Sequence, residues 1–207
     1  MVGTLTVQTI QGPTSGANAN KVIIPSGHTL DASGATITPS AGQIVQTVQT
    51  RENGLSSGNP VGAWVEMDSR YRVSITPKFS NSIIRLEYHI PMNPSGASNI
   101  LMAIAPWRST DGGSTQTRLA QGDAGNLGSR FNLAVSWFRS NNGFDANDMQ
   151  NHVVIASETA GTTGTLTYGF HFRSEGTNTT YFCHSQSNNG TWGWMAPITM
   201  IATEIKQ

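Results

Sequence analysis

The sequence has few cysteines and few charges. Cys183 is the one cysteine in 207 residues, which excludes a disulfide within the chain and a cysteine-rich zinc site. Charged residues make up 12% of the chain, against about 25% in an average soluble protein. The 12 basic and 12 acidic side chains cancel, so no long-range field is expected to attract nucleic acid. Packing or oligomerisation must therefore stabilise the fold, and neutral polar groups must keep it soluble.

Long apolar runs are missing as well. No stretch approaches the roughly 18 residues that span a bilayer, and no basic segment followed by an apolar one opens the sequence. We therefore expect no membrane insertion and no Sec-dependent export. No glycine-rich phosphate loop joins a strand to a helix, so nucleotide binding is not expected either.

The first twenty residues form a short alternating segment followed by a linker. Leu5, Val7 and Ile10 are its large apolar side chains, and residues 11–20 are rich in Gly, Asn and Ser. A single strand ahead of a linker cannot bury its apolar face or pair its own backbone. We predict that residues 1–20 are an attachment strand and linker, which bind another protein.

Residues 21–42 contain very short apolar stretches separated by Gly and Pro turns. A single chain of this kind would expose most of its backbone. Three copies around one axis can bury their apolar side chains together. We predict a short intertwined trimeric β stem, and hence a homotrimer, packed through Val22, Ile24, Leu30 and Ile37.

From residue 43 onward, longer apolar and polar alternations are separated by Gly- and Asn-rich turns. They predict strands at 43–50, 61–67, 72–78, 82–90, 99–107, 131–139, 151–157, 165–173, 179–185 and 198–205. About ten strands without a helical period indicate an all-β fold, a jelly-roll-like β-sandwich head over residues 43–207. The connection from about 109 to 130 is long for a loop, so it either has a function or contains another strand.

Alternation also predicts which side chains form the core. In the strand over 82–90, Ile84, Leu86, Tyr88 and Ile90 share one face. Two further rows supply aromatic core residues: Leu166, Tyr168, Phe170 and Phe172 in one strand, and Phe131, Leu133, Val135 and Trp137 in the other.

Several short phrases point to a family. They are GTLTVQTIQG at 3–12, KVIIP at 21–25, SGHTLD at 26–31, IVQ at 44–46, SITPK at 74–78 and NSII at 81–84. These phrases resemble tail-fibre-like virion structural proteins of marine and cyanobacterial phages. The resemblance implies a trimeric fibre that assembles in the host cytoplasm, is fastened to the particle by its N-terminal segment, and turns a distal β domain toward the host. A capsid decoration or head fibre protein, or a carbohydrate-binding module, remains an alternative.

Acidic pairs and histidines give no recognisable catalytic or metal site. Glu66 with Asp68, and Asp145 with Asp148, could serve glycoside hydrolysis, but such pairs are expected by chance among 12 scattered acidic residues. The five histidines lack close metal-ligand spacing. We expect no catalytic residue, no metal and no cofactor, and a chain that is not an enzyme.

One histidine pair depends on a predicted hairpin. If residues 174–178 form its turn, His171 and His184 share one face, while the opposite face buries Phe170, Phe172, Tyr181 and Cys183. A three-fold axis could then gather histidines around an ion. Ordinary surface or interface histidines are the more common outcome.

The best candidates for recognition are aromatic. Trp192 and Trp194 lie in a glycine-bounded turn, and large aromatic side chains on a loop can stack on a sugar ring. Trp107 and Arg108 begin another predicted loop that could lie nearby. We predict these four residues as receptor or host surface glycan contacts; burial at the end of the sandwich or between subunits is the alternative for the tryptophans.

Overall fold

The computed structural model describes residues 13–17, 22–28, 39–94, 100–119, 136–140, 148–176, 179–187 and 195–207. The side chains of 100, 101 and 136–140 are outside this description. The chain divides into two compact units, Met1–Thr38 and Pro39–Gln207. The predicted attachment residues Leu5, Val7 and Ile10 lie outside the described residues, as do Leu30 and Ile37 of the predicted stem.

The second unit is built from β-strands. They are β1 (Ile44–Glu52), β2 (Ser56–Gly58), β3 (Arg72–Ile75), β4 (Ile83–Pro94), β5 (Ile100–Ser109), β6 (Thr117–Arg118), β7 (Ser136–Ser140), β8 (Gln150–Thr159), β9 (Leu166–Ser174), β10 (Thr180–Phe182) and β11 (Ile198–Ile205). No helix is found in the described part of the chain, and so none that could cross a membrane. The all-β prediction is confirmed.

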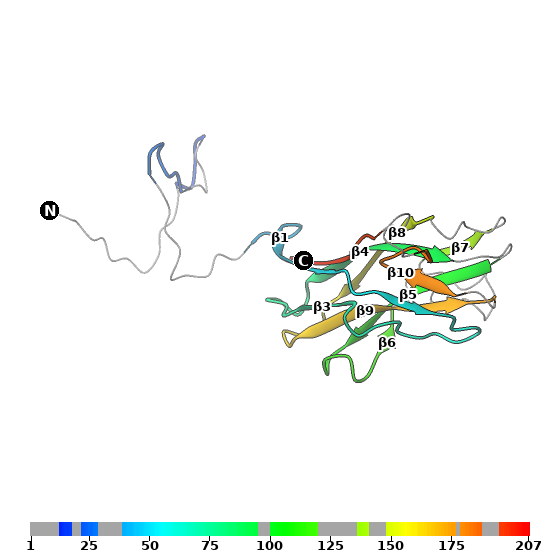
Figure 1. The fold of residues 1–207 in the computed structure, drawn as a ribbon. Helices are drawn as coiled ribbons and strands as arrows, with labels where there is room; N and C mark the ends of the chain where they lie inside the picture. Colours follow the sequence, from blue (N-terminus) through cyan, green and yellow to red (C-terminus); the bar gives the residue numbers. More distant parts are fainter. Residues whose placement is uncertain are drawn as a thin grey trace. The chain divides into compact units, whose positions relative to one another are not determined.

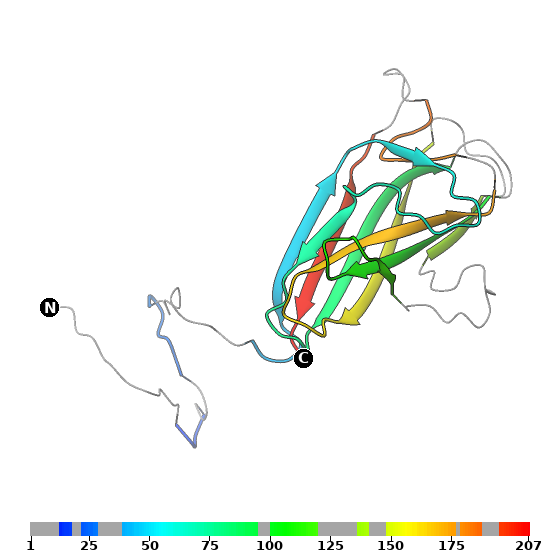
Figure 2. The ribbon, with the colours of Figure 1, turned by 90° about the horizontal axis from the view of Figure 1, so that it is seen from below.

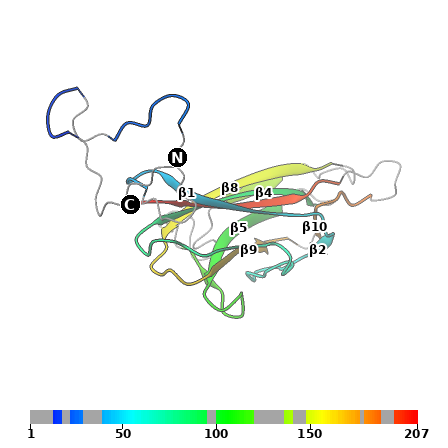
Figure 3. The ribbon, with the colours of Figure 1, turned by 90° about the vertical axis from the view of Figure 1, so that its left-hand side faces the viewer.

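The strands form two antiparallel sheets, and Figure 1 labels strands of both. The first sheet has the order β1-β11-β4-β8; β10 pairs with the last residues of β4, and β2 pairs with β10. The second sheet has the order β3-β9-β5, and β6 and β7 pair with different parts of β5. Figure 3 shows the two layers edge-on.

This strand order is that of a jelly roll. Eight strands form the body of the two sheets, in the order β1-β11-β4-β8 in the first and β3-β9-β5-β7 in the second. Successive strands of this set lie in alternate sheets along the chain, except β5 and β7, which follow one another and pair within the second sheet. Two such four-stranded sheets wound from Greek keys define the jelly roll, so the predicted β-sandwich is confirmed.

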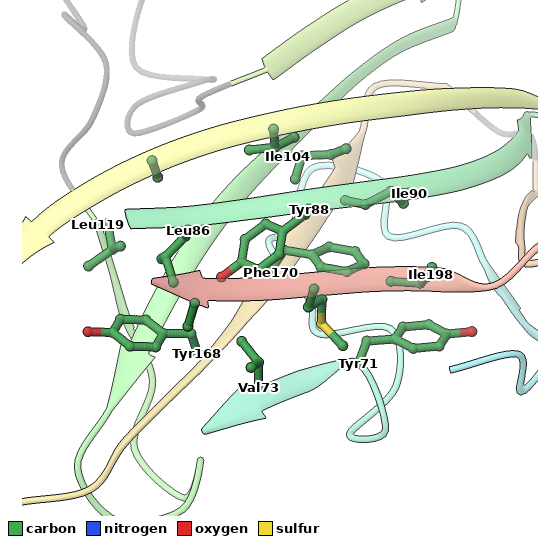
Figure 4. Packing of buried hydrophobic residues seen from close by; sticks show 14 of the residues in the cluster. Tyr71, Val73, Leu86, Tyr88, Ile90, Ile104, Leu119, Tyr168, Phe170 and Ile198 are labelled. Carbon is green, nitrogen blue, oxygen red and sulfur yellow. The ribbon is translucent and has the colours of Figure 1, made fainter. Parts of the chain in front are cut away.

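The core lies between the sheets, where the predicted alternation places it. Leu86 and Tyr88 of β4 face Tyr168 and Phe170 of β9, and none of the four is more than 1% exposed (Figure 4). The Tyr71 ring stacks on Phe170 with centroids 6.1 Å apart. The other predicted aromatic row, 131–137, lies outside the residues whose side chains are described.

The predicted hairpin over 174–178 is wrong. β9 pairs with β3 and β5 in the second sheet, whereas β10 pairs with β4 and β2 in the first. The chain therefore crosses between sheets after Ser174. Phe170, Phe172 and Cys183 are buried as expected, but Phe182 takes the buried place that the hairpin gave to Tyr181.

One other strand prediction also needs correction. The stretch 61–67 forms single bridges at Val61 and Val65 and no strand. The long connection after 109 contains β6, as one of the two alternatives proposed. The short strand β2, Ser-Ser-Gly, carries no apolar side chain and gives no sequence signal.

Strand ends define two ends of the sandwich. At one end Ile44 of β1 pairs with Ile205 of β11, and Ile83 of β4 pairs with Thr159 of β8. Pro39 leads into this end, which we call the base, and the C-terminus lies there too (Figure 2).

The opposite end, which we call the tip, contains the pairs Glu52–Ile198 and Met92–Gln150. Met195 lies here as well, three residues before β11 begins. The chain therefore joins the first unit to the base, and the tip is the part of the sandwich farthest along its strands from that junction.

Candidate functional site

Trp107 is not a surface residue. It lies within β5, opposite Gly169 of β9, and its side chain is fully buried. Ile104 and Phe170 point into the core, so alternation puts Trp107 on the outer face of the second sheet, where the Arg72 guanidinium lies 5.3 Å from its ring centre. A tryptophan covered in this way cannot stack on a ligand, and we remove it from the predicted contacts.

The polar groups above Trp107 are engaged with one another. The Arg72 guanidinium donates to both oxygens of the Glu66 carboxylate at 2.7 and 2.6 Å. The Gln116 amide donates to Glu66 at 2.7 Å, and its oxygen lies 2.6 Å from Nε2 of His171. Burial lowers the pKa of His171, and the nearby positive charge of Arg118 lowers it further. The network holds the outer face of the sheet together.

Glu66 and Asp68, the first acidic pair, each form an ion pair with an arginine. Glu66 is bound by Arg72, and Asp68 forms an ion pair with Arg70. A hydrogen bond from the Arg70 guanidinium is the main cause of the lowered pKa of Asp68. Asp145 lies outside the described residues.

Arg108 lies at the base of the sandwich. Its guanidinium is 3.3 Å from the Glu158 carboxylate of β8, which also accepts a 2.7 Å hydrogen bond from the Tyr168 hydroxyl. Arg108 and Glu158 border a hollow of about 440 Å³ that Thr110 and Thr117 also line. The ion pair joins the two sheets.

Arg108 and Met195, the residue that follows the predicted tryptophan turn, lie at opposite ends of the sandwich. Trp192 and Trp194 lie outside the described residues. Met195, which follows them directly, is at the tip and pairs with His184, whereas Arg108 is at the base and pairs with Tyr168.

A second hollow, of about 490 Å³, opens at the tip. One wall is the segment that leads into β8, with Asp148, Gln150 and Asn151. The facing wall is Met195 and Ala196, and Pro91 and Met149 complete the lining. The Met195 side chain is 58% exposed. We call this the tip hollow.

Both walls of the tip hollow are fixed to β4. The backbone N–H of Ala196 donates to the carbonyl of Cys183, at 3.1 Å, and the N–H of Cys183 donates to the carbonyl of Pro91, at 3.0 Å. On the other side, the Asn93 side-chain amide donates to the backbone carbonyl of Asp148. Because β4 is an inner strand of the first sheet, these bonds place the walls on a rigid support.

The electrostatics of the tip hollow are simple. Asp148 is the one charged residue among the described lining, and no Arg or Lys is among them. Burial lowers the pKa of the adjacent His152 to about 4, so this imidazole is neutral near pH 7. The described lining of the hollow therefore offers a carboxyl group and side-chain amides.

Cys183 is buried and holds an unusual backbone conformation. Its φ of 66° is in the left-handed region, and its Sγ lies 3.6 Å from both the Glu52 carbonyl and the Tyr71 hydroxyl. Burial raises the pKa of the thiol, although the Tyr71 hydroxyl counteracts this. We assign it a packing role at the tip.

The predicted histidine pair is also corrected. His171 lies in the second sheet, on its outer face, and His184 follows β10 in the first sheet, where its Nδ1 lies 2.9 Å from the Ser185 carbonyl. They do not share a face. Among the described residues, no three His, Cys, Asp or Glu side chains are grouped to hold a metal ion.

The tip hollow was not predicted from the sequence. Its members come from three separated segments, and neither Met149 nor Asn151 stands out in a pattern of strands and turns. The nearest signal was the glycine-bounded turn that ends before Met195.

No protein-family model matches the chain, and no curated protein matches it. Among solved structures, it is similar to a VP2 subviral particle of infectious bursal disease virus, with a TM-score of 0.34 and 12% identity over 94% of this chain and 46% of that one. T=1 particles derived from the same virus give a TM-score of 0.36 with 10% identity, over 89% of this chain and 41% of that one. Disulfide-linked pili, the endospore appendages of Bacillus, give 0.25 with 12% identity, over 83% of this chain and 98% of that one. This chain spans less than half of the viral chains it matches, and likenesses this weak carry no argument about function.

Proposed function

We propose that this chain is a structural subunit of a phage virion, a short trimeric fibre that is fastened to the particle by residues 1–20. In this role the jelly-roll head turns its tip toward the host surface. The protein acts by binding and assembly, without catalysis.

The observation that carries the proposal is the polarity of the head. Pro39 enters at the base, beside the C-terminus, where the N–H of Lys206 donates to the Gln43 carbonyl at 2.9 Å. The hollow with Met195 is at the opposite end. A head held by its base leaves the tip hollow open to a partner, as an attachment protein requires.

The first unit supports a role in assembly. Val22, Ile23 and Ile24 are 56, 57 and 43% exposed. Three consecutive aliphatic side chains in water leave apolar surface that association can bury. We infer that copies of the chain cover these residues in a trimeric stem.

Deletion of residues 1–20 tests the attachment. Phage that carry the truncated gene should assemble particles without this protein, measured by mass spectrometry of purified virions. The truncated protein should keep the wild-type sedimentation coefficient after correction for mass. Normal incorporation of the truncated chain would contradict the assignment of the attachment segment.

A capsid decoration or head fibre protein would share this polarity, and the position of the chain on the particle separates it from a tail fibre. Labelling of the C-terminus with gold and electron microscopy of virions gives that position. Label on the tail supports the proposal, and label spread over the capsid contradicts it.

A further inference from the structure

Three buried nitrogen atoms on the outer face of the second sheet have no hydrogen-bond partner among the described residues. They are Nε1 of Trp107, Nη1 of Arg118 and Nδ1 of His171. Arg118 is opposite Trp107 in the pairing of β5 with β6, and the rings of Trp107 and His171 have centroids 6.2 Å apart. A buried polar atom without a partner costs free energy, so three on neighbouring side chains indicate a site for a small polar species.

This cluster contains a positive charge without a counter-ion. Within the described part of the chain, the Arg118 guanidinium forms no ion pair and no hydrogen bond. It lies 5.1 Å from the centre of the Trp64 ring, which holds it in place but does not neutralise it. Burial lowers the pKa of Arg118, and the charge of Arg173, itself paired with Glu175, lowers it further. An anion beside Arg118 would offset both effects.

His171 can take up a proton without losing its existing hydrogen bond. The Gln116 amide N–H₂ donates to the Glu66 carboxylate, so the amide oxygen accepts from Nε2–H of His171. Nδ1 is then a bare acceptor in the neutral imidazole and a donor in the charged one. Burial and the charge of Arg118 lower the pKa of His171, and Glu66 opposes them. Arg72, another cation of this face, is paired with Glu66. An anion beside Nδ1 would favour the charged form, as Glu66 does.

The free groups define the ligand class. The indole N–H of Trp107 and the guanidinium of Arg118 only donate, so a species that they share must accept. The three nitrogens are buried, so this species must be small. We propose that the outer face of the second sheet binds a small monovalent anion such as chloride between Trp107 and Arg118, and that His171 takes up a proton from solvent when the anion binds. The site lies on a face of the head that the proposed function does not use, and it does not rest on that function.

NMR of the full-length protein labelled with nitrogen-15 tests the inference through the indole N–H signal of Trp107, which Trp107→Phe identifies. Sodium chloride replaces sodium gluconate at constant ionic strength, so that only the anion changes. We expect a saturable shift of this signal in chloride. The affinity should be about three- to ten-fold higher at about pH 5.5 than at about pH 7.5, because anion binding and protonation of His171 are linked.

A charge-removing variant and a matched control locate the site. Arg118→Met should abolish the saturable shift, since it removes the charge and keeps an apolar contact for Trp64. Arg85→Met, on the outer face of the first sheet with a side chain that is 50% exposed, should bind chloride as the wild type does. Thermal melting checks that each variant is folded, and the comparison of the two pH values needs no variant.

Three results would overturn the inference. The first is no saturable shift at either pH, which means that water alone binds the three nitrogens. The second is equal affinity at both pH values, which removes His171 from the site. The third is wild-type affinity in a folded Arg118→Met variant, which places the anion elsewhere.

Discussion

At the scale of single residues, the burial of Trp107 depends on the glycine opposite it. A Cβ on Gly169 would come within 2.5 Å of the Trp107 ring and 3.0 Å of the Tyr71 carbonyl. Gly164, in the turn before β9, would place its Cβ 3.4 Å from the nearest atom, an ordinary contact. The two glycines therefore differ in how much space a methyl group would find.

We predict that Gly169→Ala destabilises the head by about 1–3 kcal/mol, because the added methyl overpacks a closed site. Urea denaturation followed by tryptophan fluorescence measures this change. Gly164→Ala is the matched control and should change stability by less than about 0.5 kcal/mol. Equal stability of the two variants would show that the Trp107 ring shifts freely, in contrast to the packing described.

His152 links the stability of the head to pH. An exposed histidine in the unfolded chain has a pKa of about 6.5, whereas burial lowers the pKa of His152 in the folded chain to about 4. As the pH falls between these values, His152 binds a proton in the unfolded chain but stays neutral in the folded chain. The free energy of unfolding is therefore highest above about pH 6.5 and decreases as the pH is lowered through this range.

The predicted result is a smaller acid-induced loss of stability in His152→Asn than in the wild type between about pH 6.5 and 4. Urea midpoints across this range measure it. His28→Asn, in the described stretch 22–28 of the first unit, should retain the wild-type slope. A wild-type slope in His152→Asn would mean that another group controls this part of the profile.

At the scale of strands, Glu204 joins three segments at the base. It occupies an inward position of β11, after Ile198, Met200 and Ala202, and has no exposed surface. Its carboxylate accepts hydrogen bonds from the backbone N–H groups of Lys78 and Phe79 at 2.9 and 3.0 Å, and from the Gln46 amide at 2.7 Å. Burial alone would raise the pKa of Glu204, but these bonds outweigh it and lower the pKa.

Glu204→Gln should destabilise the head by about 1–3 kcal/mol, since its amide has one acceptor oxygen in place of two and its N–H₂ group would leave at least one of these donors unpaired. Thermal melting at neutral pH measures the change. The pKa of Glu204 is depressed, so its contribution is present above about pH 4.3 and is lost as the pH falls further. The melting temperature of the variant should therefore approach that of the wild type in acid. Glu87→Gln, on the outer face of β4 and partly exposed, should have little effect at either pH.

The strands also show what the sequence could and could not predict. Alternation identified β4 and β9 and their buried faces, because burial on one face is a local pattern of period two. It failed after Ser174, where a short turn was taken for a hairpin, because the choice of sheet depends on partners far along the chain. Glu204 shows the same limit: a carboxylate at a core position marks a special site, but its three donors lie in other segments.

At the scale of the whole molecule, the base and the tip were not predictable, because they follow from the winding of both sheets. The sequence shows only that Trp107 and Arg108, like Trp192 and Trp194, are near a turn, so it leaves open whether the two turns lie close together. Jelly-roll order places the end of β5 at the base and Met195 at the tip. Which turns lie at the same end of the sandwich depends on the pairing of strands far apart in the sequence, such as β1 with β11.

The two units lead to a last prediction, on assembly. Val22, Ile23 and Ile24 expose their side chains in the first unit, whereas the second unit buries its own core. The full chain should sediment at three times its 22.1 kDa mass, and a fragment of residues 39–207 should be a folded monomer. Equilibrium sedimentation and circular dichroism measure both properties.

Substitutions in the first unit locate the contact between chains. Ile24→Asp should dissociate the trimer, because three buried carboxylates around one axis would repel one another and lose their hydration. Thr14→Asp, in the exposed stretch 13–17, adds the same charge and should leave the trimer intact. If fragment 39–207 is itself a trimer, or if Ile24→Asp stays trimeric, the contact between chains lies in the head and the stem assignment is wrong.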